Sequence, residues 1–472
     1  MTKKISFFLN TFLMLMLILL FFSVSLGANK LLIWSCLIIF YFNFLACIRK
    51  PLQIVSGIKT YIKIDVFFML FFYIIYYYPY QLYVLGLKNL NQTKFLDATY
   101  SEYANKAIIM STIGLLAFQL GYQYFNANLN HTIIHQISKK YYRLLIGTIL
   151  FFIVLILIIF AKTGMTTLFA GAYVGSKMGS ATYDAIFGLV TYFVLLGVAE
   201  SVYSYVINKK LTLNILIFSA VALAWTIALM VIGDRNTFFL VSVVALAGIF
   251  TYMRGISRKQ IIVGIFAALF LYQIIEISRV SESRNLTSLL DAFSTVTNES
   301  EGELEIGSFD ITTIGNRATY KVTENRGVFY GKFKLISLAS IFPYSSRLFV
   351  DPNDVFTGSS NILKDEMIGL NKTWGVGTNI ISDCYLDFGF LGVIIIMFGI
   401  GRFGGYVKTN AQRNINSPKW MFIYIITLGY YSELARYGFD FPLRSIAWTY
   451  LLFFFLDKML KSPKSVIDDV DV

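Results

Sequence analysis

Charged side chains at the ends of long apolar runs are the residues of this sequence best suited to chemistry. Asp383 and Asp387 stand four apart where one run begins, and Glu276 and Arg279 stand three apart where another ends. Residues at these spacings share one face of a helix. Because a charge is costly to bury in lipid, charged residues at such positions are usually functional.

Further charges of this kind occur at two other run ends. Arg235 closes the tight turn 233–235 between two runs, and Glu433 and Arg436 crowd the end of the last run but one. Several carboxylates and arginines could therefore meet around one cavity. The alternative for each pair is a structural ion pair at the membrane interface.

The chemistry that these residue types favour is binding of phosphate and transfer of a proton. An arginine offers a planar, permanently charged fork that grips phosphate oxygens in pairs, and a carboxylate can accept a proton. The polar segment 278–382 supplies further cations, whose alternative role is a solvated surface or contact with lipid phosphates. They are Arg279, Arg284, Arg317, Lys321, Arg326, Lys332, Lys334, Arg347, Lys364 and Lys372.

Composition places these residues in a membrane protein. Of the 472 residues 57% are apolar and 14% are charged, and the mean hydropathy is +0.65. In a soluble protein about a quarter of all residues are charged, so this composition excludes both a water-soluble enzyme and a disordered chain. The net charge of +13 comes from short gaps between apolar runs, which indicates membrane topology and no nucleic-acid partner.

The sequence has few residues that could bind a metal ion or form disulfide bonds. Three cysteines and two histidines, His131 and His135, are too few for a disulfide framework, a zinc cage or a histidine-rich site. We therefore predict no metal site and no cofactor.

The elements that must position the charged residues are membrane helices. About twenty apolar residues cross a bilayer core, and twelve runs have this character. An all-α polytopic membrane protein with about 12 transmembrane helices is therefore predicted. The runs are 5–26, 31–48, 64–85, 105–124, 142–161, 184–207, 211–232, 237–253, 260–277, 383–406, 419–435 and 443–460.

Lysine and arginine predict the orientation of these runs. With the N-terminus in the cytoplasm, the internal gaps hold 20 basic residues and the short outward gaps hold nine. Cytoplasmic gaps carry this excess in membrane proteins, so both termini are predicted to be cytoplasmic. The first run is longer than the apolar part of a cleaved signal peptide, so it is expected to remain as a span.

The predicted organisation has four parts. Residues 1–277 form nine transmembrane helices with short loops, and residues 278–382 form one long extracytoplasmic loop of 105 residues. Residues 383–460 form three more transmembrane helices, followed by a cytoplasmic tail, 461–472. Loops this long are usually functional. We expect short helices in this one, lying on the membrane face.

Six tyrosines surround Pro79 near the outer end of the third run. We interpret them as an aromatic belt at the membrane surface next to a kinked helix, with sugar stacking as the alternative. They are Tyr73, Tyr76, Tyr77, Tyr78, Tyr80 and Tyr83.

This layout, together with short motifs, resembles the Wzy-type oligosaccharide repeat-unit polymerases of bacterial surface polysaccharides (O-antigen and capsule). Segment 233–237 (GDRNT) is similar to the Gly-x-Arg turn of polymerases and O-antigen ligases. Segment 374–379 (WGVGTN), which leads into 383–392 (DCYLDFGFLG), is similar to the run that re-enters the membrane. Arg347 and Gly358 fit the family's Arg-x10-Gly pattern, whereas the third outer gap, 162–183, has no arginine.

The resemblance implies a glycosyltransferase in the bacterial plasma (inner) membrane, with the bilayer and an undecaprenyl-diphosphate-linked oligosaccharide as partners. Such an enzyme joins repeat units on the extracytoplasmic side and releases polyprenyl diphosphate. The family also implies a chain-length regulator as a partner.

Roles for the charged residues follow from this implied reaction. Asp383 is the predicted base, and Arg235 and Glu276 complete the predicted catalytic group. Glu276, Asp387 and Glu433 are the alternative bases. The residues expected to bind substrate are Arg279, Arg284, Arg347, Asp387, Glu433 and Arg436.

Three other functions remain open. A lipid-linked oligosaccharide flippase needs cations along a central cavity, and here few charges lie within the runs. An O-antigen ligase is associated with a histidine in the long outer loop, which here has none. A glycosyltransferase that uses polyprenyl-monophosphate sugars is expected to have paired acids in its first outer gap, and 27–30 has no acid.

Overall fold

The computed structural model shows an all-helical arrangement in the part of the chain that it describes. The described residues are 3–55, 57–91, 96, 98–124, 139–163, 181–232, 235–264, 307–342, 345–349, 356–372, 375–414 and 417–460. Within them there is no strand, and the one β-bridge joins Leu52 to Thr60. This confirms the predicted all-α class.

The helices of the first half follow the predicted runs closely. They are α1 (Lys3–Ser23), α2 (Lys30–Ile48), α3 (Ile64–Tyr76), α4 (Tyr78–Val84), η1 (Ser101–Tyr103), α5 (Ala104–Gln123), α6 (Lys139–Thr163), α8 (Ala181–Asn208), α9 (Leu213–Ile232) and α10 (Arg235–Gly248). A short π-helical turn, η3 (Ile249–Met253), continues α10. The third run is broken between α3 and α4 at Tyr77, next to Pro79, as the proline predicts.

The second half has three long helices and several helices from the predicted outer loop. They are α13 (Gly307–Arg326), α14 (Lys332–Ala339), η4 (Ser345–Leu348), α15 (Ser359–Ile368), α16 (Ile380–Arg413), α17 (Pro418–Leu434) and α18 (Asp440–Leu460). The predicted run 260–277 lies mostly outside the described residues.

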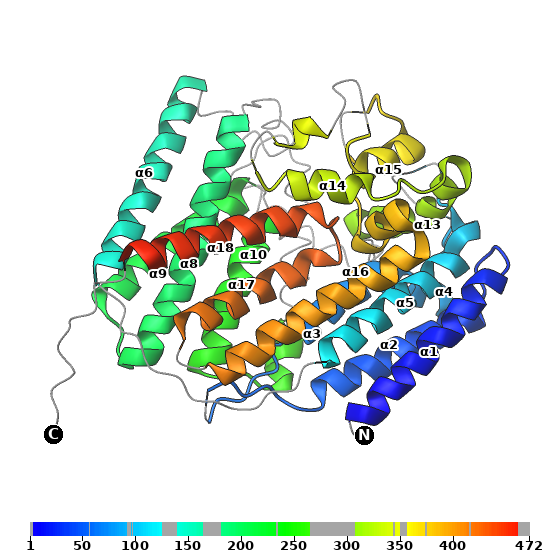
Figure 1. Ribbon diagram of the computed structural model, residues 1–472, viewed down its shortest axis with the longest axis horizontal. Coiled ribbons are helices and arrows are strands. Elements are labelled where there is room, and N and C mark those ends of the chain that lie inside the picture. Colours follow the sequence, from blue (N-terminus) through cyan, green and yellow to red (C-terminus); the bar gives the residue numbers. More distant parts are fainter. Residues whose placement is uncertain are drawn as a thin grey trace.

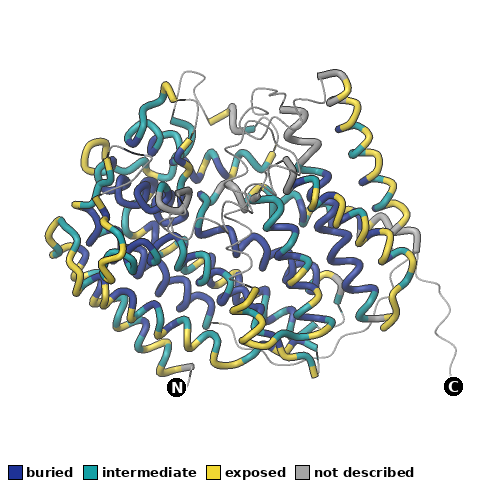
Figure 2. Tube along the Cα trace, turned by 180° about the vertical axis from the view of Figure 1, so that it is seen from behind, coloured by how far each residue is buried: buried dark blue, intermediate teal, exposed yellow. Residues whose placement is uncertain are grey.

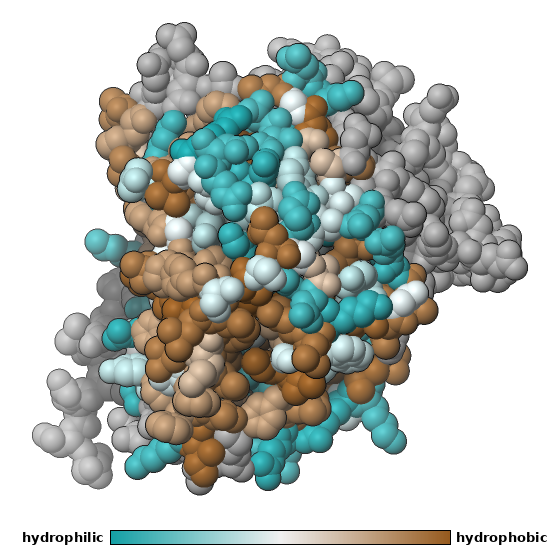
Figure 3. Space-filling model, turned by 90° about the vertical axis from the view of Figure 1, so that its right-hand side faces the viewer, coloured by the Kyte–Doolittle hydropathy of each residue, from teal (hydrophilic) through white to brown (hydrophobic). Residues whose placement is uncertain are grey.

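Six of the described helices are long and apolar enough to cross a membrane. They are Lys4–Ser23, Lys30–Ile48, Ser101–Gln123, Gly188–Val206, Asn236–Met253 and Ile380–Arg413. Four shorter apolar helices accompany them. On the face shown in Figure 3, apolar side chains dominate the middle of the described surface, and polar side chains gather above and below. This is the surface of a multi-pass membrane protein.

Helices α5 and α16 pack closely against each other, and their backbones touch through glycine. A Cβ atom on Gly401 would lie 2.0 Å from the carbonyl oxygen of Phe118, and one on Gly121 would lie 2.1 Å from that of Phe398. Small residues allow such close approach between membrane helices. Nearly all of α5 is buried as a result, as the dark core of Figure 2 illustrates.

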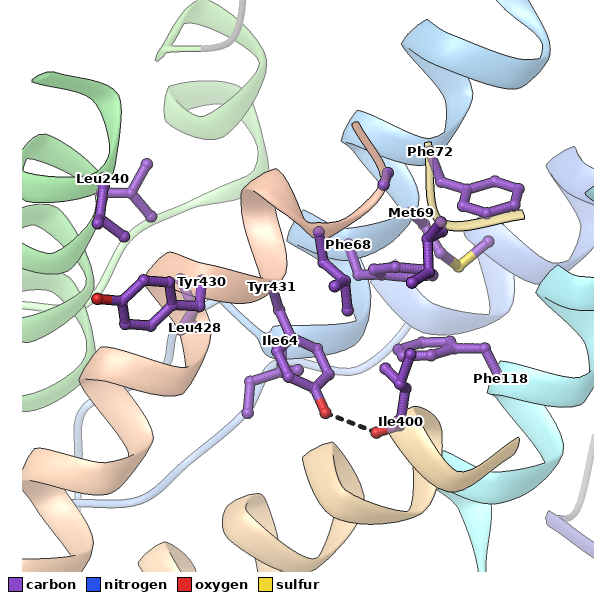
Figure 4. Close-up of a cluster of buried hydrophobic side chains, with 14 of the residues drawn as sticks. Ile64, Phe68, Met69, Phe72, Phe118, Leu240, Ile400, Leu428, Tyr430 and Tyr431 are labelled. Atoms are coloured by element: carbon purple, nitrogen blue, oxygen red, sulfur yellow. Dashed lines mark hydrogen bonds between the residues drawn. The ribbon is translucent and has the colours of Figure 1, made fainter. Parts of the chain in front are cut away.

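The apolar core joins α3, α5, α16 and α17. Phe68 stacks on Phe118 at a centroid distance of 4.0 Å, and both rings also face Tyr431. The Tyr431 hydroxyl donates a hydrogen bond of 2.6 Å to the carbonyl of Ile400, which is drawn in Figure 4. These contacts therefore hold four helices together.

Helix α13 differs from the expectation for the outer loop. It is 20 residues long and packs against α3, α5, α15 and α16, where short helices on the membrane face were expected. Several of its polar side chains are buried and hydrogen-bonded: Thr313 donates to the carbonyl of Ile75, and Asn316 donates to Ser111. Because threonine and asparagine are hydrophilic, the hydropathy pattern wrongly places these residues of α13 at the protein surface. In Figure 1, α13, α14 and α15 lie at the end of the bundle away from the start of α1.

The short gaps group at the two ends of the bundle. At one end, Arg258 donates to the carbonyl of Arg49, and Gln412 donates to that of Gln53. At the other end, Tyr100 donates to the carbonyl of Glu366 on α15. The gaps predicted to share a side of the membrane are thus in contact.

Half of the six tyrosines around Pro79 lie inside the bundle. Tyr76, Tyr77 and Tyr80 are fully buried, and two of them bond within the bundle. The hydroxyl groups of Tyr76 and Tyr77 find partners there, which makes burial of these two rings favourable.

Candidate functional site

A break in α16 creates the polar centre of the candidate site. Gly389 has φ +64° and ψ −155°, which interrupts the helix. The carbonyls of Leu386 and Asp387, just before the break, accept hydrogen bonds from Phe329 and Gly331. Broken helices in membranes need such outside partners for their backbone groups. The loop before α14 is thereby tied to the first two turns of α16.

Asp387 anchors the start of α14. Its carboxylate accepts hydrogen bonds from the backbone nitrogens of Phe333, at 3.0 Å, and Lys334, at 2.7 Å. These amides belong to the first turn of the helix and have no partner within it. A negative charge at this position is favourable for the helix. The side chain of Asp387 is fully buried.

A buried ion pair joins α14 to α16. The Lys334 ammonium lies 2.5 Å from Oδ2 of Asp383 and 3.5 Å from Oδ2 of Asp387, and it also donates to the Asp383 carbonyl. Burial alone would lower the pKa of Lys334. The neighbouring carboxylates, Asp383 foremost, raise it by more than burial lowers it, so that the net pKa lies above the ordinary 10.5. Lys334 is therefore a permanent cation.

Asp383 is the point where four elements meet. Besides Lys334, its carboxylate accepts a hydrogen bond of 2.6 Å from the hydroxyl of Ser359 on α15 and one of 2.9 Å from the backbone nitrogen of Phe439, just before α18. The residue is 4% exposed. One side chain thus fixes α14, α15 and the start of α18 on the first turn of α16.

The turn between α17 and α18 is held at its other end by Tyr76. The Tyr76 hydroxyl lies 3.1 Å from the carbonyl of Ala435 and 2.8 Å from the side-chain oxygen of Asn379. Asn379 caps α16 by accepting from the nitrogen of Ser382. The turn Ala435–Phe439 is therefore fixed at both ends by groups around the N-terminus of α16.

Arg436 extends from this turn to the beginning of α10. Its guanidinium donates a hydrogen bond of 3.1 Å to the side chain of Asn236, the second residue of α10, and packs on the ring of Tyr437. Arg235, beside Asn236, is the first residue of α10. A helix N-terminus and a guanidinium next to one another form a region suited to an anion.

The structure brings together some of the predicted site residues. Asp383 and Asp387 share Lys334, Arg436 reaches the first turn of α10, and Glu433 is buried one turn before Arg436. Arg235 begins α10 and Arg347 lies in η4, with only their backbones described. Glu276, Arg279 and Arg284 lie outside the described residues.

Three important residues were not singled out from the sequence. Lys334 stood among ten cations without distinction, Ser359 carried no functional signal, and Tyr76 was noted only as one of six tyrosines around Pro79. The sequence contained one clue to Lys334, which is its position between Phe333 and the mostly apolar stretch 335–341. Within the described part of the chain there is no group of three or more residues that could hold a metal ion.

Comparison with known proteins gives one clear result. The family model for O-antigen polysaccharide polymerase Wzy matches residues 4–460, which is nearly the whole chain. No curated protein and no solved structure matches the chain.

Proposed function

The chain belongs to the O-antigen polysaccharide polymerase Wzy family, and we propose that it joins polyprenyl-diphosphate-linked oligosaccharide repeats on the extracytoplasmic side of the bacterial inner membrane. The proposed carrier is undecaprenyl diphosphate, and a chain-length regulator is the proposed protein partner. The observation that carries the chemistry is the meeting of Arg436 with the first turn of α10, beside the N-terminus of α16.

The proposed reaction transfers the growing chain. The acceptor hydroxyl oxygen of the incoming unit bonds to the anomeric carbon of the growing chain, and the bond from this carbon to the diphosphate oxygen breaks. Negative charge builds up on the leaving diphosphate, so fixed cations stabilise the transition state. Removing one such contact typically slows a reaction by ~10²–10³-fold. Arg235 and Arg436 are the proposed diphosphate contacts, with Arg279, Arg284 and Arg347 as further proposed contacts.

The acceptor proton needs a carboxylate. Asp383 and Asp387 have their oxygens occupied by donors from α14, α15 and the turn before α18. Glu276 and Glu433 are the proposed carboxylates for this proton transfer. A positioned base typically contributes ~10²–10⁴-fold.

The proposed topology has the end with α13, α14 and α15 outside the cell. The basic gaps around Arg49, Arg258 and Arg413 lie together at the other end, which supports a cytoplasmic location for that end. The site with Arg436 is then extracytoplasmic.

A gel of surface glycolipid from a strain lacking this gene tests the proposal. Loss of the polymerase should leave a single band, one repeat unit on its acceptor, in place of the ladder. Absence of even this band would contradict the proposal, because export or ligation would then have failed.

A further inference from the structure

We propose that Asp383 is a positioning residue that holds Arg436 at the first turn of α10, and that it does not take the acceptor proton. This inference deepens the proposed function and rests on it. The contacts of Asp383 and the fixed turn after α17 carry the argument.

The first step concerns the carboxylate itself. A general base must present a lone pair to the hydroxyl that it deprotonates. Oδ1 of Asp383 accepts from Ser359, and Oδ2 accepts from both Lys334 and the nitrogen of Phe439. With 4% of its surface exposed, Asp383 has little room for a sugar hydroxyl.

The second step follows the turn from Asp383 to Arg436. The hydrogen bond from the nitrogen of Phe439 to Asp383 fixes the end of the turn, three residues after Arg436. The hydrogen bond from Tyr76 to the carbonyl of Ala435 fixes its beginning, one residue before Arg436. With both ends fixed, the guanidinium is directed to Asn236.

The third step gives Lys334 its role. Asp383 is buried, and a buried charge without a partner is strongly destabilising. The Lys334 ammonium supplies the compensating charge at 2.5 Å. Lys334 thereby allows a buried carboxylate to accept the hydrogen bond from Phe439. Through this ion pair, α14 helps to set the position of Arg436.

Paired substitutions separate positioning from proton transfer. Asp383→Asn places an amide against the Lys334 ammonium and should slow polymerisation by ~10²-fold, as loss of a fixed cation does. The double variant Asp383→Asn with Lys334→Gln replaces the ion pair by a neutral amide pair, and the asparagine oxygen can again accept from Phe439. The double variant should regain a rate within about tenfold of the wild type. A base could not be rescued in this way.

The assay uses membrane vesicles that contain the full-length variant and receives the strain's own lipid-linked repeat unit. Initial rates of polymer formation are compared at equal amounts of inserted protein, measured by immunoblot. Asp365→Asn serves as the matched control, because it breaks an ion pair of the same length, 2.5 Å, between Arg326 and α15 at a more exposed place. It should leave the rate unchanged.

A double-mutant cycle provides the second readout and does not depend on rescue. If Asp383 acts through Arg436, then Asp383→Asn should lower the polymerisation rate by less than about threefold in the Arg436→Gln background. A similar ~10²-fold loss in both backgrounds would overturn the proposal, as would an inactive double variant that inserts normally. These failures differ from failure of the proposed function, which the gel of the deletion strain tests: that function fails if the strain keeps its polysaccharide ladder or lacks even the single-unit band.

Discussion

Substitution of one glycine at the α5–α16 contact should destabilise the whole bundle. In Gly401→Ala the new Cβ atom would lie 2.0 Å from the carbonyl oxygen of Phe118 and 2.8 Å from its carbonyl carbon. Both atoms are backbone, so no side chain can rotate away. The two helices must separate by about an ångström to restore van der Waals contact.

The magnitude follows from what separation would disturb. Gly121 and Gly405 make similar approaches within about one turn of it, at 2.1 Å and 2.5 Å, so a shift at Gly401 opens the whole contact. Overpacking of a core typically costs about 1–3 kcal/mol. Because the obstacle here is backbone, we expect the upper end, about 3 kcal/mol.

Gly399→Ala is the matched control. Gly399 lies two residues earlier in α16, and a Cβ atom there has nothing within 4 Å. Alanine favours a helix over glycine by about 1 kcal/mol, so this variant should be neutral or slightly stabilised. The stability of both variants is measured as a thermal midpoint in detergent, by size-exclusion chromatography of fluorescent fusions after heating. Equal midpoints for Gly401→Ala and Gly399→Ala would refute the packing argument.

Three further predictions concern the polar end of the bundle. Charge reversal in Arg235→Glu should abolish polymer while leaving membrane insertion intact, and a variant that still makes long chains would remove Arg235 from the site. Lys334→Met should lower stability by about 3–5 kcal/mol, because it leaves Asp383 without its cation. Since the pKa of Lys334 is raised above 10.5, the stabilising ion pair is complete below that pH and is lost only above it. The difference in thermal midpoint between the wild type and Lys334→Met should therefore stay constant from about pH 7 to about pH 10. Gly331→Ala should destabilise by about 1–3 kcal/mol, because φ is +85° there and its Cβ atom would lie 2.6 Å from the ring of Phe388, with Gly375→Ala, which meets nothing, as the control.

Most of the bundle could be predicted because lipid imposes a simple rule. A run of about twenty apolar residues forms a helix, and Lys3, Lys50 and Lys408 mark the gaps between runs. The break at Tyr77 also followed from Pro79. These signals are local, so no knowledge of distant contacts is needed to read them.

Helix α13 and the role of Lys334 could not be predicted because both depend on distant partners. Thr313 and Asn316 look like surface residues until Ile75 and Ser111 provide their hydrogen bonds. Lys334 resembles the other lysines of its loop. Only the fold places it beside two carboxylates that follow 49 and 53 residues later in the chain. The spacing of Asp383 and Asp387 predicted correctly that they share a face, but the sequence held no sign that the face is filled by α14.

The contact between α5 and α16 has a consequence for how the protein is made. Helix α16 begins 257 residues after α5 ends (380 − 123). At ribosomal speeds of about 5–20 residues per second, α5 waits roughly 13–50 s for its partner. During that time its glycine face and its inward-facing asparagine and threonine side chains stay in lipid or against the insertion machinery. Nascent chains that end before α16 should therefore be prime substrates for membrane quality-control proteases, and slow translation of the last quarter should reduce the yield of folded protein.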